Sequence, residues 1–126
     1  MNILGLGSQI HDCARVRKLI EKHAEKFLYE VFTEREIAFC NQRSHCTEYY
    51  AAVWASKEAV FRSLGRKWKR GMSWHDVEIV CQKGGDARVK LTGPTRERAL
   101  AKGAKGIRVS FAYTRLFATA TAITLK

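Results

Sequence analysis

YAAVWASKEAVFRSL, residues 50–64, has the composition of a helix, and a glycine, Gly65, follows it directly. Alanine, leucine, lysine, glutamate and arginine favour helical backbone, and neither glycine nor proline interrupts the segment. We therefore predict about four helical turns that end at Gly65. At about 100° per residue, the large apolar side chains share one broad face, which is typical of a helix packed on a core. These side chains are Tyr50, Val53, Trp54, Val60, Phe61 and Leu64.

Lys57 lies in the middle of this apolar face, with Glu58 at its margin and Arg62 one turn further on. An unpaired buried charge is unfavourable, so a plain amphipathic helix would not place a lysine there. In one interpretation Lys57 extends to solvent, and Glu58 and Arg62 form an i,i+4 ion pair. In the other, all three side chains line a cleft that binds an anion, together with a metal ion.

The length and charge of the chain limit its class. Its 126 residues, 46% of them hydrophobic, suffice for a packed core, so we expect a single domain over residues 1–126. Lysine and arginine number 23 against 12 aspartates and glutamates, which gives a formal net charge of +11. Such a charge favours a polyanionic partner, which is a nucleic acid, an acidic protein or a phosphate-rich cofactor.

The sequence carries no pattern of a membrane span, a signal peptide or a cysteine-based metal site. No apolar run approaches a length of about 18 residues, so we expect a cytoplasmic protein with no membrane partner. The four cysteines form no CxxC pair, and their spacing with the histidines matches no usual zinc pattern. We interpret them as reduced thiols.

The N-terminal part of the chain predicts a strand followed by two helices. The apolar run at 3–7, with its glycines, is typical of a buried first strand. Asp12 is a plausible N-cap for a helix over 13–31. Thr33 and Glu36 form a capping box, which predicts a short helix from 34 to about 42. The buried stripe of the longer helix contains Val16, Leu19, Ile20, His23, Phe27 and Val31.

The C-terminal part predicts two hairpins separated by a helix. RKWKRG, residues 66–71, is an irregular basic loop, in which Trp68 either packs on its own loop or stacks on a base. Gly93-Pro94 opens a helix that ends around Gly103. Alternating or β-branched runs predict strands over 77–81, 87–91, 107–112 and 117–125. Together with the N-terminal elements, this pattern predicts an α+β fold.

Segments from nearly the whole chain match one family in order and spacing. They are GLG at 5–7, RVRK at 15–18, FLYEVFTEREIAFC at 27–40, ASKEAVFRSLG at 55–65, GMSWHDVEI at 71–79 and SFAYT at 110–114. The most specific part is W-A-x-K-E-A, followed at the right distance by G-x-S-W-x-D-[IV]-E. The chain resembles the bacterial holo-acyl-carrier-protein synthases, the small phosphopantetheinyl transferases. The resemblance implies their α+β fold.

The resemblance implies transfer of 4′-phosphopantetheine from coenzyme A (CoA) to a serine of apo-acyl carrier protein, with release of 3′,5′-ADP. The reaction serves fatty-acid or related biosynthesis, and the family assembles as a homotrimer with active sites between subunits. Mg²⁺ on the CoA pyrophosphate, with Mn²⁺ as an alternative ion, is implied at Gln9 and Glu58. Catalysis is implied for Glu58 and Arg62. The resemblance implies contacts to CoA at Lys57, Gly65, Ser110, Tyr113 and Thr114. The acidic carrier protein is implied to dock on Arg15, Arg17, Lys18 and Lys22.

The chain departs from the family pattern at several of these positions. Gln9 stands in place of the metal aspartate, and a neutral amide is a weaker magnesium ligand than a carboxylate. Arg62 replaces a lysine, Val53 an arginine and Tyr113 a histidine. Asp12 is a candidate to compensate for Gln9. Three functions therefore stay open: a divergent transferase, a relative that binds carrier protein or CoA without transfer, and a basic nucleic-acid-binding module.

Overall fold

The structure is a computed structural model that describes residues 2–65, 73–82 and 87–126. Its five-stranded sheet has the order β1-β5-β4-β3-β2, and all neighbouring strands are antiparallel. The strands are β1 (Ile3–Asp12), β2 (Val77–Cys81), β3 (Ala87–Leu91), β4 (Gly106–Tyr113) and β5 (Phe117–Leu125). The helices are α1 (Cys13–His23), α2 (Glu25–Val31), α3 (Glu34–Asn41), α4 (Cys46–Ser63), α5 (Gly93–Ala101) and the 3₁₀ turn η1 (Trp74–Asp76). The fold is α+β, as the sequence predicts.

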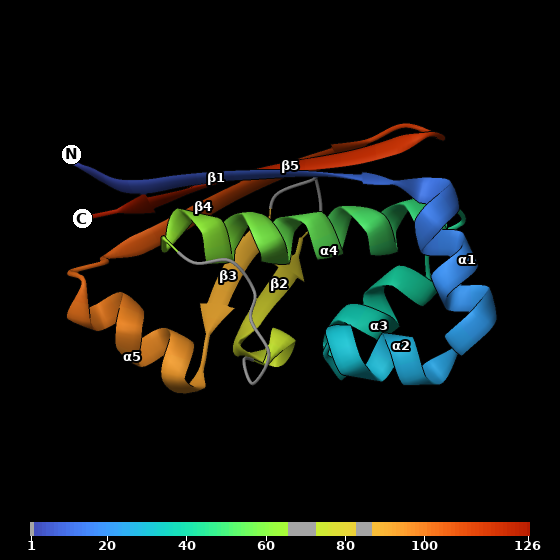
Figure 1. The fold of residues 1–126 in the computed structure, drawn as a ribbon, viewed down its shortest axis with the longest axis horizontal. Helices are drawn as coiled ribbons and strands as arrows, with labels where there is room; N and C mark the ends of the chain where they lie inside the picture. Colours follow the sequence, from blue (N-terminus) through green and yellow to red (C-terminus); the bar gives the residue numbers. More distant parts are fainter. Residues whose placement is uncertain (1, 66–72, 83–86) are drawn as a thin grey trace.

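The long helix α4 lies along one face of the sheet, and the other helices gather near its two ends (Figure 1). α1, α2 and α3 are at the end where α4 begins, whereas α5 is near the end where α4 stops. α4 packs against β1, β5 and β4, and against α1 and α3. The core therefore forms between the sheet and the helix that the sequence predicts most clearly. No described helix is both long and apolar enough to span a membrane.

Two glycines of β1 allow α4 to approach this strand closely. A Cβ at Gly5 would lie 1.9 Å from the backbone oxygen of Ser63, and a Cβ at Gly7 would lie 2.2 Å from that of Ala59. Neither distance leaves room for a side chain, since packed carbon and oxygen atoms stay more than about 3 Å apart. The GLG segment is therefore the surface on which the second half of α4 rests.

Several predicted boundaries are wrong. β1 continues to Asp12, although the sequence suggests that the strand ends within the GLG segment. The helix predicted over 13–31 is two helices, because Ala24 takes a positive φ of 46° and interrupts it. His23 lies at this break and is exposed, so it does not belong to the buried stripe. α4 begins at Cys46, about one turn before the predicted start.

Other predictions from the sequence are confirmed. The Thr33 hydroxyl accepts from the Glu36 N–H at 3.2 Å, and the Glu36 carboxylate accepts from the Thr33 N–H at 2.8 Å, which completes the capping box. Gly65 follows α4 with a φ of 78°, as expected of a glycine after a helix. β2, β3 and β5 have the predicted bounds. The basic loop with Trp68 and the turn at 83–86 lie outside the described residues.

The face of the sheet opposite α4 carries no helix among the described residues (Figure 1). Apolar side chains are nevertheless exposed there: Leu6 and Ile10 of β1 are 65% and 60% exposed, and Phe117 of β5 is 48% exposed. Leu6 lies opposite Ile123 in the pairing of β1 with β5, so apolar residues of both strands contribute to this face. An exposed apolar strip of this kind is typical of surfaces that contact another molecule.

Candidate active site

A pocket of about 370 Å³ joins the two predicted metal ligands, Gln9 and Glu58. Gln9 and His11 are two positions apart on β1, so they point to the same side of the strand. Glu58 and Arg62 are one turn apart on α4, and the side chains of both line the pocket. The pocket is lined by Gln9, His11, Arg15, Trp54, Glu58, Arg62 and Trp74.

Each carboxylate oxygen of Glu58 has a hydrogen-bond partner from β1. His11 Nε2 lies 2.6 Å from Oε1, and Gln9 Nε2 donates to Oε2 at 2.5 Å. Burial by itself would raise the pKa of Glu58, but the hydrogen bonds from His11 and Gln9, together with the charge of nearby Arg62, lower it below its ordinary value. Glu58 is therefore ionised at neutral pH.

Two arginines make the pocket cationic despite this carboxylate. Arg62 Nη1 donates to the backbone oxygen of Ser8 at 3.2 Å, which holds the guanidinium beside β1. Arg15 reaches the pocket from α1. Guanidinium groups match the geometry of phosphate oxygens and remain charged at all physiological pH values. A pocket with two guanidinium groups and one carboxylate is suited to a phosphate or diphosphate group.

His11 is a site residue that the sequence analysis missed. Its side chain is 7% exposed and stacks on Trp54, with ring centroids 4.4 Å apart and 14° between the planes. The signal that could have found it is the period of two along a strand. A strand predicted as far as residue 12 would have placed His11 and Gln9 on the same face. A strand predicted to end at Gly7 says nothing about the direction of either side chain.

Both interpretations of Lys57 are wrong. Its side chain neither reaches solvent nor lines the pocket: it is fully buried, and Nζ lies 2.7 Å from Oε1 of the equally buried Glu36. The other oxygen of Glu36 accepts from the Ile79 N–H at 2.8 Å. Burial raises the pKa of Glu36 and lowers that of Lys57, and their mutual attraction opposes both changes. This pair joins α3, α4 and β2, so Lys57 has no access to a phosphate.

The predicted nucleotide contacts on the β4–β5 hairpin do not reach this pocket within one chain. Tyr113 packs on Tyr49, with ring centroids 5.0 Å apart. Tyr49 precedes Glu58 by nine positions, which is roughly 13 Å along a helix. The Thr114 hydroxyl accepts from two backbone N–H groups of the hairpin turn and so stabilises that turn. Ser110 is exposed on β4, on the face of the sheet away from α4.

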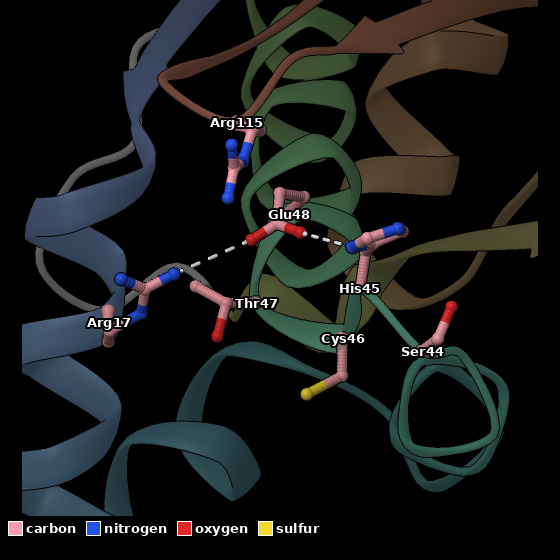
Figure 2. Close-up of a pocket in the computed structure, with 7 residues that line it drawn as sticks. All are labelled: Arg17, Ser44, His45, Cys46, Thr47, Glu48 and Arg115. Carbon is pink, nitrogen blue, oxygen red and sulfur yellow. Dashed lines mark ion pairs between the residues drawn. The ribbon is translucent and has the colours of Figure 1, made fainter.

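A second pocket, also of about 370 Å³, lies at the start of α4 (Figure 2). Glu48 pairs there with Arg17 of α1 at 3.7 Å and with His45 at 3.3 Å. Figure 2 shows that Arg115, from the β4–β5 turn, points into the same pocket. The guanidinium of Arg17 is thus engaged by a carboxylate of its own chain, unlike the other predicted carrier-protein contacts.

Asp12 does not join the site around Glu58. Its Oδ1 accepts from the N–H groups of Ala14 and Arg15, at 2.8 and 3.4 Å, and so caps α1. Neighbouring side chains on a strand point to opposite faces, which directs Asp12 away from the side that His11 occupies. The extra donor beside Gln9 and Glu58 is therefore His11, not Asp12.

The donor atoms of the pocket fit a divalent cation that also binds oxygens of a substrate. Glu58 provides a carboxylate, and the Gln9 amide presents its oxygen when it rotates about its terminal bond. Among the described residues, no three or more histidine, cysteine, aspartate or glutamate side chains cluster in an arrangement that could hold a metal. Water and phosphate oxygens would complete the coordination, as they commonly do for Mg²⁺.

Comparison with known proteins gives the family. The model of the 4′-phosphopantetheinyl transferase superfamily matches residues 5–119. The chain is 41% identical to the holo-[acyl-carrier-protein] synthase of Rhodopirellula baltica over 93 residues, 74% of each chain. It is 38% identical to that of Desulforudis audaxviator over 121 residues, 96% of this chain and 92% of the other. The structure of the Helicobacter pylori holo-[acyl-carrier-protein] synthase in complex with coenzyme A matches with a TM-score of 0.82 at 22% identity, over 95% of this chain and 99% of that one. The chain belongs to the 4′-phosphopantetheinyl transferase superfamily.

Proposed function

We propose that the protein is a holo-acyl-carrier-protein synthase, which transfers 4′-phosphopantetheine from CoA to a serine of apo-acyl carrier protein and releases 3′,5′-ADP. The observation that carries the proposal is the pocket in which an ionised Glu58 lies with Arg15 and Arg62, next to the basic helix α1. Relatives along nearly the whole chain are named as this enzyme, and the Helicobacter pylori structure contains coenzyme A.

The chemistry requires positive groups around a diphosphate. The serine oxygen forms a bond to the phosphorus that carries pantetheine, and the bond from this phosphorus to the bridging oxygen breaks. The serine proton is released, and 3′,5′-ADP leaves. Negative charge builds on the phosphoryl oxygens during the attack, so cations that face them lower the barrier. We assign this role to Arg62, assisted by Arg15, and we place Glu58 beside the reacting phosphate.

Glu58 and Gln9 would hold Mg²⁺, or Mn²⁺ in its place, when the pyrophosphate is bound. A bound cation supplies positive charge that polarises the phosphoryl oxygens. Coordination of this cation requires the Gln9 amide oxygen to turn away from the Ile10 N–H, from which it accepts a hydrogen bond at 3.0 Å. Glu58 must also release at least one of its two hydrogen bonds.

The acidic carrier protein is proposed to dock on α1. Arg15, Lys18 and Lys22 are exposed and share one side of the helix at about 100° per residue. Arg15 also lines the pocket, so a partner bound along this side would bring its serine toward Glu58. Arg17 lies on the other side of α1, and it can contact the carrier protein only if its ion pair opens.

We further propose a homotrimer with active sites between subunits. One supporting observation is the exposed apolar strip on the open face of the sheet. Another is the distance of roughly 13 Å along α4 between Glu58 and the level of Tyr113. A neighbouring subunit that presents its own Tyr113 and Thr114 to this pocket would complete the nucleotide contacts, which one chain alone does not assemble.

The proposed setting is the cytoplasm, in fatty-acid or related biosynthesis. All cysteines in the described ranges, Cys13, Cys40, Cys46 and Cys81, are free thiols, which is typical of a reducing compartment. A carrier protein and the phosphates of CoA account for the net charge of +11 without a nucleic acid.

A transfer assay tests the proposal. Purified protein, CoA, Mg²⁺ (Mn²⁺ in parallel) and apo-acyl carrier protein are mixed, and the carrier is weighed by mass spectrometry. We expect a carrier heavier by one phosphopantetheine, and a loss of about 10²-fold or more in rate for Glu58→Gln, which keeps the shape but not the charge. If a known synthase modifies the same carrier and this protein does not, the transferase assignment fails. Binding of CoA or carrier protein without transfer would then favour the alternative of an inactive relative.

A further inference from the structure

We propose that His11 is a ligand of the divalent cation at Glu58, so that the pocket prefers a transition-metal ion of the Mn²⁺ class to Mg²⁺. The inference rests on the proposed function only in placing a cation at Glu58. It adds a nitrogen ligand that the family resemblance does not assign, and it names the chemical class of the ion.

The positions of the two side chains support a shared ion. His11 Nε2 lies 2.6 Å from Oε1 of Glu58. Ligands that share one ion, each about 2.1 Å from it, lie about 3 Å from each other. To share an ion, the nitrogen and the oxygen must separate by a few tenths of an ångström, and the carboxylate must also turn, because the Nε2 lone pair lies along the present hydrogen bond and an ion on that line would overlap Oε1. The stack of His11 on Trp54 holds the imidazole plane in this orientation.

An imidazole coordinates a metal ion through a ring nitrogen that carries no proton. Without a cation, Nε2 faces the ionised carboxylate of Glu58, which can only accept, so Nε2 is the donor. The neutral tautomer that carries its proton on Nδ1 leaves Nε2 as a metal ligand. A side chain that donates to the carboxylate in one state thus coordinates beside it in the other.

The donor set determines which ion fits. Mg²⁺ strongly prefers oxygen ligands and gains little from an imidazole. For divalent ions of the first transition row, imidazole is a good ligand, and carboxylate oxygen also suits Mn²⁺. Gln9 contributes an amide where a second carboxylate would have favoured Mg²⁺. A site with His11, Glu58 and Gln9 therefore shifts the preference from Mg²⁺ to Mn²⁺.

Electron paramagnetic resonance with Mn²⁺ alone tests this inference on the untagged protein. Pulsed measurement of the bound ion detects the ¹⁴N nucleus of a coordinated imidazole, a signal that a purely structural role of His11 would not produce. We expect ¹⁴N coupling in the wild type. His11→Phe keeps the stack on Trp54 but has no ring nitrogen, so we expect it to lose the coupling and to bind Mn²⁺ about tenfold more weakly or worse. Its affinity for Mg²⁺, measured by competition, should change less than about twofold.

The second histidine–glutamate pair supplies the matched control. His45→Phe removes the imidazole nitrogen that pairs with Glu48 in the other pocket, and it should leave the ¹⁴N coupling unchanged. His11→Gln, which can still donate to Glu58, should lose the coupling as His11→Phe does, and circular dichroism checks that both variants fold. The inference is overturned if the wild type binds no Mn²⁺ or shows no nitrogen coupling, or if the coupling persists without His11. Transfer activity without nitrogen coupling would overturn this inference alone, whereas coupling without transfer would overturn only the proposed function.

Discussion

Lys57→Met is expected to lower the free energy of unfolding by about 3 kcal/mol, because it leaves a buried carboxylate without its cation. The side chains of Lys57 and Glu36 are both fully buried and 2.7 Å apart. Methionine fills most of the space of the lysine, so the loss is mainly electrostatic. Glu36 keeps its bonds from the N–H groups of Thr33 and Ile79, each at 2.8 Å, but these carry no net charge.

The size of this loss in unfolding free energy depends on how the Glu36 carboxyl group responds when Lys57 is removed. Removal of one member of a buried ion pair costs about 3–5 kcal/mol. The carboxyl group limits this loss by taking up a proton: from an ordinary pKa of about 4.3, protonation at pH 7 costs about 3.7 kcal/mol. The loss at pH 7 should therefore lie between about 3 and 4 kcal/mol, and the melting temperature should fall by roughly 10 to 15 °C.

The loss should also depend on pH. The unfolded chain releases the proton of Glu36 near about pH 4.3, whereas burial without Lys57 makes the folded variant hold this proton to a higher pH. Between these values the folded variant binds more protons than the unfolded chain, so its stability falls as the pH rises. In the wild type, burial also raises the pKa of Glu36, but the charge of Lys57 opposes the change. The wild type should therefore lose less stability over the same interval.

Urea unfolding at about pH 5 and about pH 7, followed by circular dichroism, measures both effects. Lys22→Met changes an exposed lysine and should alter the stability by less than about 0.5 kcal/mol. Adding Glu36→Gln to Lys57→Met should restore part of the lost stability, because a neutral amide needs no counter-charge. A loss below about 1 kcal/mol at pH 7, or one that does not shrink toward pH 5, would refute the reasoning from a buried ion pair.

Three further substitutions test the packing, docking and assembly described above. Gly7→Ala should cost about 2–3 kcal/mol or prevent folding, because the new Cβ would lie 2.2 Å from the backbone oxygen of Ala59; an unchanged melting temperature would contradict the close approach of β1 and α4. Lys18→Glu should raise the KM for apo-acyl carrier protein by about tenfold and leave kcat nearly unchanged, because it reverses a charge on the docking helix; steady-state kinetics with an unchanged KM would remove Lys18 from that surface. Leu6→Glu should dissociate the proposed trimer, because assembly would bury a carboxylate in each subunit; light scattering that still gives a trimer would place the subunit contact elsewhere.

The elements that the sequence predicts well are those with local signals. The capping box at Thr33 gives the start of α3, and Gly65 gives the end of α4. The break at Ala24 has no such signal, because alanine is a strong helix former and neither glycine nor proline is nearby. The start of α4 is hidden for a related reason: His45 precedes it without a side-chain cap. Both boundaries lie where α1, α2 and α3 gather at the start of α4, so we attribute them to packing between helices.

The residues of the candidate site also fall into two groups: those with a local signal in the sequence and those without one. Glu58 and Arg62 are recognisable because one helix carries both, and their spacing alone places them together. The role of Lys57 depends on Glu36, which lies on another helix, so the helical wheel shows a lysine on an apolar face but not its partner. His11 depends on how far β1 extends. Each of these errors concerns a contact between elements, which the periodicity of one element does not report.

Gln9 and His11 act together on one carboxylate, that of Glu58. With an aspartate at position 9, as the family pattern has it, a second carboxylate would lie close to Glu58, and the two would repel unless they shared a cation or a proton. Here Gln9 and His11 donate to the two oxygens instead, so Glu58 is ionised and oriented before any cation binds. Both donors can also become ligands, Gln9 by rotation of its amide and His11 by a change of tautomer. The same three side chains can therefore form the cation-free and the cation-bound site.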